Sequence, residues 1–265
     1  MESSAYEVLE RVGEGSFGRV HRGRRRFTGQ IVALKFVAKA GKSPAELAAL
    51  RSEVAILRRL DHPNIVLLLD FFETPRDVVL VTEFAHGELL AVLAADGALA
   101  PRTVRRVAAQ LVAALRYLAA ARVMHRDLKP QNCLVGSRGV IKLADFGFAR
   151  ELGAARSALL TSIKGTPLYM APEMFSSAAY TESADVWGLG VLLFELAAGR
   201  PPFYAPSLAE LLKVIVSDAP PAFPPEWPRD LVRFIAACLQ RDPSARPTWD
   251  ALAAHEFLAG ADADD

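Results

Sequence analysis

Short runs of β-branched and aromatic residues dominate the first third of the chain, and they predict strands. The runs are separated by turn-forming residues or by one helical segment, and a glycine-rich stretch lies between the first two. This part of the chain is therefore expected to be mainly β-sheet. The predicted strands are residues 6–12, 20–25, 30–38, 65–70 and 78–83.

One predicted helix interrupts the strands, and the rest of the chain is mostly helical. The first helix has Ser43 as a favoured N-cap, Pro44 at its first position and Glu46 to complete a capping box. Residues 181–198 are apolar on nearly every side, so this helix is expected to be buried within protein. Strands followed by helices indicate an α+β fold. The later elements are helices at residues 101–121, 181–198, 207–217, 229–239 and 248–258, and a hairpin formed by residues 133–135 and 140–144.

Length and charge narrow the classes of protein to consider. A chain of 265 residues is large for one core, small for two independent domains, and suited to two lobes that share a cleft. The net charge of +1 creates no global field for nucleic acid, and no apolar stretch is long enough for membrane insertion. Two cysteines, both among apolar residues, predict buried thiols and a reducing compartment.

Basic residues crowd one early segment of the chain, residues 19–26. We interpret them as a solvated strand edge. The alternative is a contact for an acidic partner or a phosphate.

Two short motifs carry the chemistry. Residues 125–132 read His-Arg-Asp-Leu-Lys-Pro-Gln-Asn, and residues 145–147 read Asp-Phe-Gly. Together they place acidic and amide groups and one lysine on short connections between apolar segments. Such an inventory suits binding of Mg²⁺ on a nucleotide and orientation of a hydroxyl for attack on phosphorus. The side chains concerned are Asp127, Lys129, Asn132 and Asp145.

Two further features upstream point to a nucleotide. Residues 13–20 match a glycine-rich loop. This loop is either a β-hairpin lid that covers phosphates or a plain hairpin turn. A dinucleotide-binding fold would instead require a helix after Gly18. Lys35 lies within an apolar strand and Glu53 on the inward row of the predicted helix. Since either charge would be costly alone, we expect the two to pair. The alternative for Lys35 is a side chain that snorkels from an edge strand.

The whole set resembles a eukaryotic protein kinase, and the resemblance covers residues 6–258. It implies a bilobal kinase fold: a small antiparallel β-sheet lobe with one main helix at about residues 6–83, a hinge at 83–87, and a larger, mostly α-helical lobe at about 88–258. Residues 259–265 would be an acidic tail. The implied cofactors are ATP and Mg²⁺, and the implied partner is a protein substrate.

The resemblance also implies a role for each site residue. Asp127 would accept the substrate hydroxyl proton, while Lys129 would neutralise charge on the γ-phosphoryl group. Asn132 and Asp145 would hold Mg²⁺. Lys35, paired with Glu53, would hold the α and β phosphates. The residues implied around ATP are Val12, Gly13, Glu14, Gly15, Ser16, Phe17, Gly18, Arg19, Val20, Ala33, Lys35, Glu83, Ala85 and Leu134.

The resemblance implies that residues 145–173 form an activation segment, whose end at residues 165–173 matches the family's substrate-docking loop and Ala-Pro-Glu anchor. It also implies that Glu173 pairs with Arg246 and that Asp185 fixes the backbone of the catalytic loop.

A regulatory site is implied within the activation segment. Thr161 and Ser162 occupy the position where such kinases are often phosphorylated, with Ser162 in register. Arg126 could pair with that phosphate. The alternative is two ordinary loop hydroxyls.

The motifs indicate a serine/threonine kinase and, more narrowly, the Fused family. Residues 12–20, 145–150 and 160–170 carry this closer resemblance. It suggests a cytoplasmic protein with signalling, cytoskeletal or ciliary partners. A nucleotide-binding scaffold with vestigial catalysis is the alternative, because Fused proteins are credited with scaffold roles. A dinucleotide-dependent oxidoreductase is a third and weaker hypothesis.

Overall fold

The computed structural model describes residues 5–15, 18–146, 150–151, 167–175, 181–217 and 219–259. The chain divides into two compact units. One comprises Met1–Gly87 with Leu134–Gly147, and the other comprises Glu88–Cys133 with Phe148–Asp265. The segment Leu134–Gly147, expected in the larger lobe, thus groups with the strand-rich unit.

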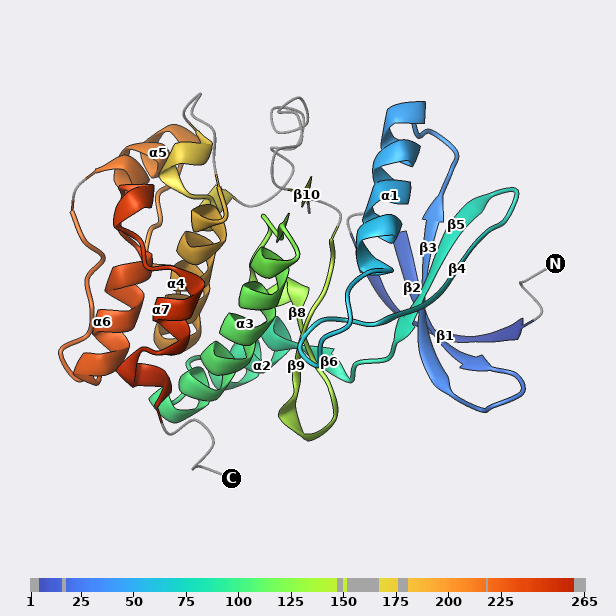
Figure 1. The fold of residues 1–265 in the computed structure, drawn as a ribbon, viewed down its shortest axis with the longest axis horizontal. Helices are drawn as coiled ribbons and strands as arrows, with labels where there is room; N and C mark the ends of the chain where they lie inside the picture. The colour runs from blue at the N-terminus through green and yellow to red at the C-terminus, as the bar shows by residue number, and fades with distance from the viewer. Residues whose placement is uncertain are drawn as a thin grey trace. The chain divides into compact units, whose positions relative to one another are not determined.

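The first unit is built on a five-stranded antiparallel sheet with the strand order β1-β2-β3-β5-β4 (Figure 1). Alternate residues of β3, such as Val32 and Leu34, are buried and join Tyr6, Val79 and Val81 in one core. The strands are β1 (Tyr6–Gly15), β2 (Gly18–Arg25), β3 (Ile31–Ala38), β4 (Leu68–Glu73) and β5 (Asp77–Glu83).

The basic segment of the chain lies on the first of these hairpins. Arg22 pairs with Glu10 at 3.0 Å, and Arg24 pairs with Glu7 at 2.6 Å. Both glutamates lie on the neighbouring strand β1, and the paired side chains remain partly exposed to solvent. The expected exposure to solvent therefore fits the structure, but β2 lies between β1 and β3, so the expected strand edge is wrong.

Helix α1 (Pro44–Leu57) lies beside the sheet (Figure 1) and begins as the sequence predicts. The Ser43 hydroxyl accepts a hydrogen bond from the Glu46 backbone N–H at 3.3 Å, and the Ser43 N–H donates to the Glu46 carboxylate at 2.8 Å. This capping box satisfies two donors that the helix itself leaves open. On the outer side of α1, Arg51 is tied to Glu73 of β4 at 3.2 Å.

A small second sheet explains why Leu134–Gly147 belong to the first unit. Its strand order is β6 (Gly87–Glu88), β8 (Cys133–Val135) and β9 (Ile141–Leu143), so the predicted hairpin is confirmed. Asn64 donates its side-chain amide to the Ile141 carbonyl at 3.0 Å, and Lys142 pairs with Glu83 at 2.8 Å. Ile65 forms a parallel bridge with Leu143, so the strand predicted at residues 65–70 is displaced to β4.

The second unit is helical and is organised around α4 (Ser183–Ala198). This helix packs against α3 and α6 (Figure 1), and thirteen of its residues are buried, as its apolar pattern predicts. At Gly190 an added Cβ would lie 2.7 Å from the Cys238 Cβ, so only glycine allows this close packing. The other helices are α2 (Leu89–Asp96), α3 (Pro101–Ala120), α5 (Leu208–Val216), α6 (Arg229–Cys238) and α7 (Trp249–Ala253).

In this unit one helix was missed and one predicted helix needs correction. Helix α2 was not predicted from the sequence, because it has neither a side-chain N-cap nor an acidic residue in its first turn. The helix predicted at residues 248–258 is broken into α7 and a 3₁₀ turn at Glu256–Leu258. The cause is His255, whose Nδ1 accepts a hydrogen bond from the Phe257 N–H at 3.1 Å and starts a new turn.

The two cysteines are buried free thiols, as predicted. Burial raises the pKa of Cys133 to about 12, and it raises the pKa of Cys238 as well.

We expect both thiols to resist iodoacetamide at pH 8 in the folded protein and to react after denaturation, as read by mass spectrometry. Because the unfolded thiols ionise near pH 8.5 and the folded ones do not, the unfolding free energy should fall above about that pH. Rapid alkylation of the native chain would contradict this.

Within the described ranges, no helix combines the length and the hydropathy that a bilayer-spanning segment needs.

Candidate active site

The predicted site residues form two groups, one in each unit. In the first unit, Lys35 of β3 lies between two acids. Its Nζ is 3.3 Å from Asp145 Oδ1 and 3.8 Å from Glu53 Oε1. The expected pair with Glu53 is therefore present, while the contact with Asp145 was not foreseen. The Glu53 side chain is 7% exposed and the Lys35 side chain 21%, so neither is a surface ion pair.

Electrostatics in this group favour a charged lysine. Burial alone would lower the pKa of Lys35, but the carboxylates of Asp145 and Glu53 outweigh it and raise that pKa. Burial also raises the pKa of Glu53, with Lys35 acting in the opposite direction. A permanently charged ammonium group held by two carboxylates suits the binding of anionic phosphate oxygens.

Asp145 follows β9 in an unusual backbone conformation. Its φ is +62°, in the left-handed region that non-glycine residues rarely adopt. Such a conformation costs about 1–3 kcal/mol and persists where the surroundings determine it, commonly at functional sites. Here it accompanies a carboxylate that contacts Lys35.

The glycine-rich loop is a β-hairpin and not the start of a helix. Gly13 pairs with Val20 and Gly15 pairs with Gly18 across β1 and β2, which confirms the hairpin prediction. Gly18 has φ +154°, and an added Cβ would lie 2.0 Å from the Phe36 carbonyl oxygen. Only glycine therefore lets the loop approach β3 so closely. Ser16 and Phe17 lie outside the described residues.

One face of the sheet carries the residues implied around the nucleotide. Strand pairing sets Val20 opposite Lys35, and alternation puts Ala33 on the same face as Lys35. At the end of β5 the Glu83 carboxylate accepts hydrogen bonds from Lys142 at 2.8 Å and the Leu67 N–H at 2.9 Å. The Glu83 side chain thus secures the segment that leads to Ala85.

In the second unit, the Asp127 carboxylate is held by two neighbours. Its Oδ2 accepts hydrogen bonds from Lys129 Nζ at 2.6 Å and from Asn132 Nδ2 at 2.8 Å. Asn132 donates also to the Asp127 backbone carbonyl at 2.8 Å. Since the Asn132 amide nitrogen is engaged with Asp127, its Oδ1 is the group left to act as a ligand.

The backbone of this loop is fixed by a buried acid. Asp185 of α4 accepts hydrogen bonds from the His125 N–H at 2.8 Å and the Arg126 N–H at 2.7 Å, as the sequence predicts. Arg126 has φ +71°, which these bonds hold in place. Burial raises the pKa of Asp185, although the two backbone N–H groups and the charge of His125 oppose the rise.

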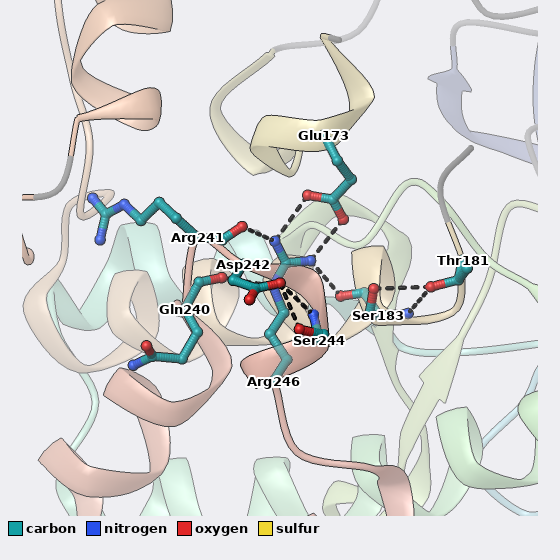
Figure 2. Close-up of polar contacts among 8 residues, drawn as sticks. All are labelled: Glu173, Thr181, Ser183, Gln240, Arg241, Asp242, Ser244 and Arg246. Atoms are coloured by element: carbon teal, nitrogen blue, oxygen red, sulfur yellow. Dashed lines mark hydrogen bonds and ion pairs between the residues drawn. The ribbon is translucent and has the colours of Figure 1, made fainter. Parts of the chain in front are cut away.

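A second buried ion pair secures the chain near the predicted end of the activation segment (Figure 2). Arg246 binds Glu173 through two nitrogens, at 2.7 and 2.8 Å, which confirms the predicted pair. Its remaining hydrogen bonds go to the backbone carbonyls of Ser183, Gln240 and Arg241 at 2.8, 2.7 and 3.2 Å. All five N–H donors of the guanidinium are therefore used.

Comparison with known proteins identifies the fold and family. Residues 6–258 match the family described as protein kinase domain. The chain belongs to the protein kinase family. It is 50% identical over 259 residues to serine/threonine-protein kinase 36 of Pongo abelii, covering 96% of this chain and 19% of that protein. The bilobal kinase class and the serine/threonine group, both predicted from the motifs, are confirmed.

Two other relatives support the narrower resemblance. The kinase is 49% identical over 253 residues to serine/threonine-protein kinase TIO of Arabidopsis thaliana, covering 96% of this chain and 19% of the relative. It is 41% identical over 259 residues to serine/threonine-protein kinase fused of Drosophila melanogaster, covering 96% of this chain and 31% of the relative. The chain thus spans about a fifth to a third of the length of these relatives.

Several predicted positions lie outside the part of the chain that the structure describes. They include the expected phosphorylation positions and two residues of the glycine loop. These positions are Ser16, Phe17, Thr161 and Ser162.

Proposed function

We propose that this chain transfers the γ-phosphoryl group of ATP to serine and threonine hydroxyls of protein substrates. The observation that carries the proposal is the Asp127 carboxylate, which Lys129 and Asn132 hold at 2.6 and 2.8 Å. A fixed carboxylate beside an ammonium group suits a step in which a hydroxyl loses its proton as its oxygen attacks phosphorus.

The proposed step balances as follows. The substrate oxygen bonds to the γ-phosphorus, the bond from that phosphorus to the β–γ bridging oxygen breaks, and ADP leaves. The hydroxyl proton passes to Asp127. Lys129, with its Nζ 2.6 Å from that carboxylate, is placed to stabilise charge on the phosphoryl oxygens.

In this proposal the two groups of residues act on one nucleotide. Lys35, aligned by Glu53 and Asp145, would bind phosphate oxygens, and Ala33 would face the adenine. The Asn132 Oδ1 and the Asp145 carboxylate are oxygen donors of the type that Mg²⁺ prefers, so they would hold the ion. When bound, Mg²⁺ neutralises phosphate charge and aligns the triphosphate.

Regulation and cellular setting are further parts of the proposal. Phosphorylation of Ser162, or of the neighbouring Thr161, would give Arg126 an anionic partner. The resemblance to the Fused family is the basis for proposing a cytoplasmic kinase with signalling, cytoskeletal or ciliary partners.

Phosphate transfer from [γ-³²P]ATP to a generic basic protein tests the proposal. We expect phosphoserine and phosphothreonine but no phosphotyrosine after acid hydrolysis of the product. Chelation of Mg²⁺ with EDTA should stop the transfer, and restored Mg²⁺ should recover it, since phosphoryl transfer needs the ion to neutralise phosphate charge. Nucleotide binding without any transfer would favour the scaffold alternative.

A further inference from the structure

Helix α1 carries Glu53, and the rotation of this helix about its own axis decides whether that carboxylate meets Lys35. The Lys35 Nζ is 3.8 Å from Glu53 Oε1, which is longer than a hydrogen bond. This pair therefore does not by itself hold the helix at a fixed angle. Five of the fourteen residues of α1 are buried, so the apolar contact that could restrain its rotation is small.

A second ion pair holds the other side of this helix. Arg51 reaches Glu73, the last residue of β4, with its Nε 3.2 Å from one carboxylate oxygen and its Nη2 3.5 Å from the other. Successive residues of an α-helix are about 100° apart, so Arg51 and Glu53 lie on nearly opposite sides of α1. Their exposures agree with this, since the Arg51 side chain is 57% exposed and that of Glu53 7%.

Glu73 is a firm anchor because the sheet holds it independently of α1. Lys39, which follows β3, pairs with the same carboxylate at 2.7 Å and donates to the Thr74 carbonyl at 2.8 Å. Within the sheet, Glu73 is opposite Val78 of β5. The hydrogen bonds from Lys39 and Arg51 lower the pKa of Glu73, so its carboxylate stays charged at neutral pH.

We propose that Glu73 and Arg51 are positioning residues for the reaction, because their ion pair fixes the rotation of α1 so that Glu53 faces Lys35. The inference rests on the proposed kinase function, in which Lys35 binds phosphate oxygens. Neither Glu73 nor Arg51 touches the nucleotide in this scheme. When their link is lost, α1 turns more freely about its axis and Glu53 moves away from Lys35. The lysine then keeps only one of the two carboxylates that align it.

Three variants separate this proposal from a general effect of losing a surface ion pair. Arg51→Met removes the link and keeps a helix-favouring side chain at an exposed position, so the fold should tolerate it. Arg51→Lys keeps the charge without the two-nitrogen fork, and we expect it to recover part of the lost function. Arg24→Met is the matched control, because Arg24 is 52% exposed and pairs at 2.6 Å with Glu7 on the same sheet, away from α1.

The first measurement is the affinity of the full chain for a fluorescent ATP analogue in the presence of Mg²⁺. We expect the Kd of Arg51→Met to rise about 3- to 5-fold, because a smaller fraction of the protein then has Lys35 aligned to bind phosphate. The KM for ATP should rise by the same factor, while kcat at saturating ATP stays unchanged, since bound nucleotide selects the aligned state. Arg24→Met should lower the Tm as much as Arg51→Met does, but should leave the Kd unchanged. Equal Kd values for Arg51→Met and the wild type would overturn the proposal.

A double-mutant cycle shows whether the effect of Arg51 passes through Glu53. The two side chains lie on opposite sides of α1, so independent contributions would simply add. Under the proposal, Arg51→Met has no further effect on the Kd once Glu53→Gln is in place, because no carboxylate is then left to position. Additive effects of the two changes, or a wild-type Kd for Glu53→Gln alone, would contradict the positioning role.

Failure of the proposed kinase function gives a different pattern of results. If the wild-type chain transfers no phosphate but Arg51→Met still weakens binding of the ATP analogue, the transfer activity is wrong and the positioning role stands. If the wild-type chain transfers phosphate and Arg51→Met keeps the wild-type KM for ATP, the kinase function stands and the positioning role is wrong.

Discussion

Replacing Asp127 with asparagine should lower kcat about 10³-fold, within the range that a positioned proton acceptor contributes. The carboxylate accepts hydrogen bonds from Lys129 and Asn132, and an asparagine oxygen can keep the second of these. The loop should therefore hold its shape while it loses the group that takes the hydroxyl proton. The measurement is steady-state phosphorylation of a peptide substrate at saturating ATP.

The Asp127→Asn variant should change the rate of the chemical step without changing the affinity for nucleotide. Because Asp127 is not among the residues proposed to hold the triphosphate, the dissociation constant for a non-hydrolysable ATP analogue should stay unchanged. Asp96→Asn is a matched control, since Asp96 is exposed at the end of α2 and should affect neither quantity. Activity of Asp127→Asn equal to that of the wild type would refute the proposed role of this carboxylate.

Local signals in the sequence located many elements of the fold. Ser43 and Glu46 define the start of α1, because a capping box is formed entirely by neighbouring residues. The apolar pattern of residues 181–198 correctly predicts a buried helix, since nearly every side of α4 meets other protein. Where the interactions that form an element are specified by that segment alone, the sequence is enough to predict the element.

Predictions were wrong where a distant contact decides the outcome. The strand expected at residues 65–70 starts instead at Leu68, because Ile65 bridges to Leu143, which lies far along the chain. The helix expected to reach residue 258 is interrupted because the His255 side chain caps a new turn. Whether a side chain competes with the helix for backbone hydrogen bonds depends on local geometry, and the periodicity of apolar residues does not reveal that geometry.

The candidate site, too, has features that the local sequence predicts and features that depend on distant contacts. Motif spacing identifies Lys35, Asp127 and Asp145, and it also suggests that Lys35 pairs with Glu53. The closer contact of Lys35 with Asp145 and the left-handed backbone of Asp145 depend on how β3 and β9 are brought together. No local pattern carries that information, so the structure is needed to find it.

Loss of Arg246 should strongly destabilise the second unit. Arg246→Met leaves the Glu173 carboxylate, which is 8% exposed, without its partner. Removing one member of a buried pair costs about 3–5 kcal/mol of unfolding free energy. In a chain of this size that corresponds to a Tm lower by on the order of 10 °C, measured by differential scanning calorimetry.

Two further variants show which part of the interaction causes the loss. Arg246→Met with Glu173→Leu should recover part of the Tm, because no charge then remains buried. Recovery should stay incomplete, since the carbonyls of Ser183, Gln240 and Arg241 still lack the donors that Arg246 supplies. Arg233→Met is the control: its pair with Glu256 is exposed, so its loss should cost less than about 1 kcal/mol. If Arg233→Met and Arg246→Met lowered the Tm equally, burial could not be the reason that Arg246 matters.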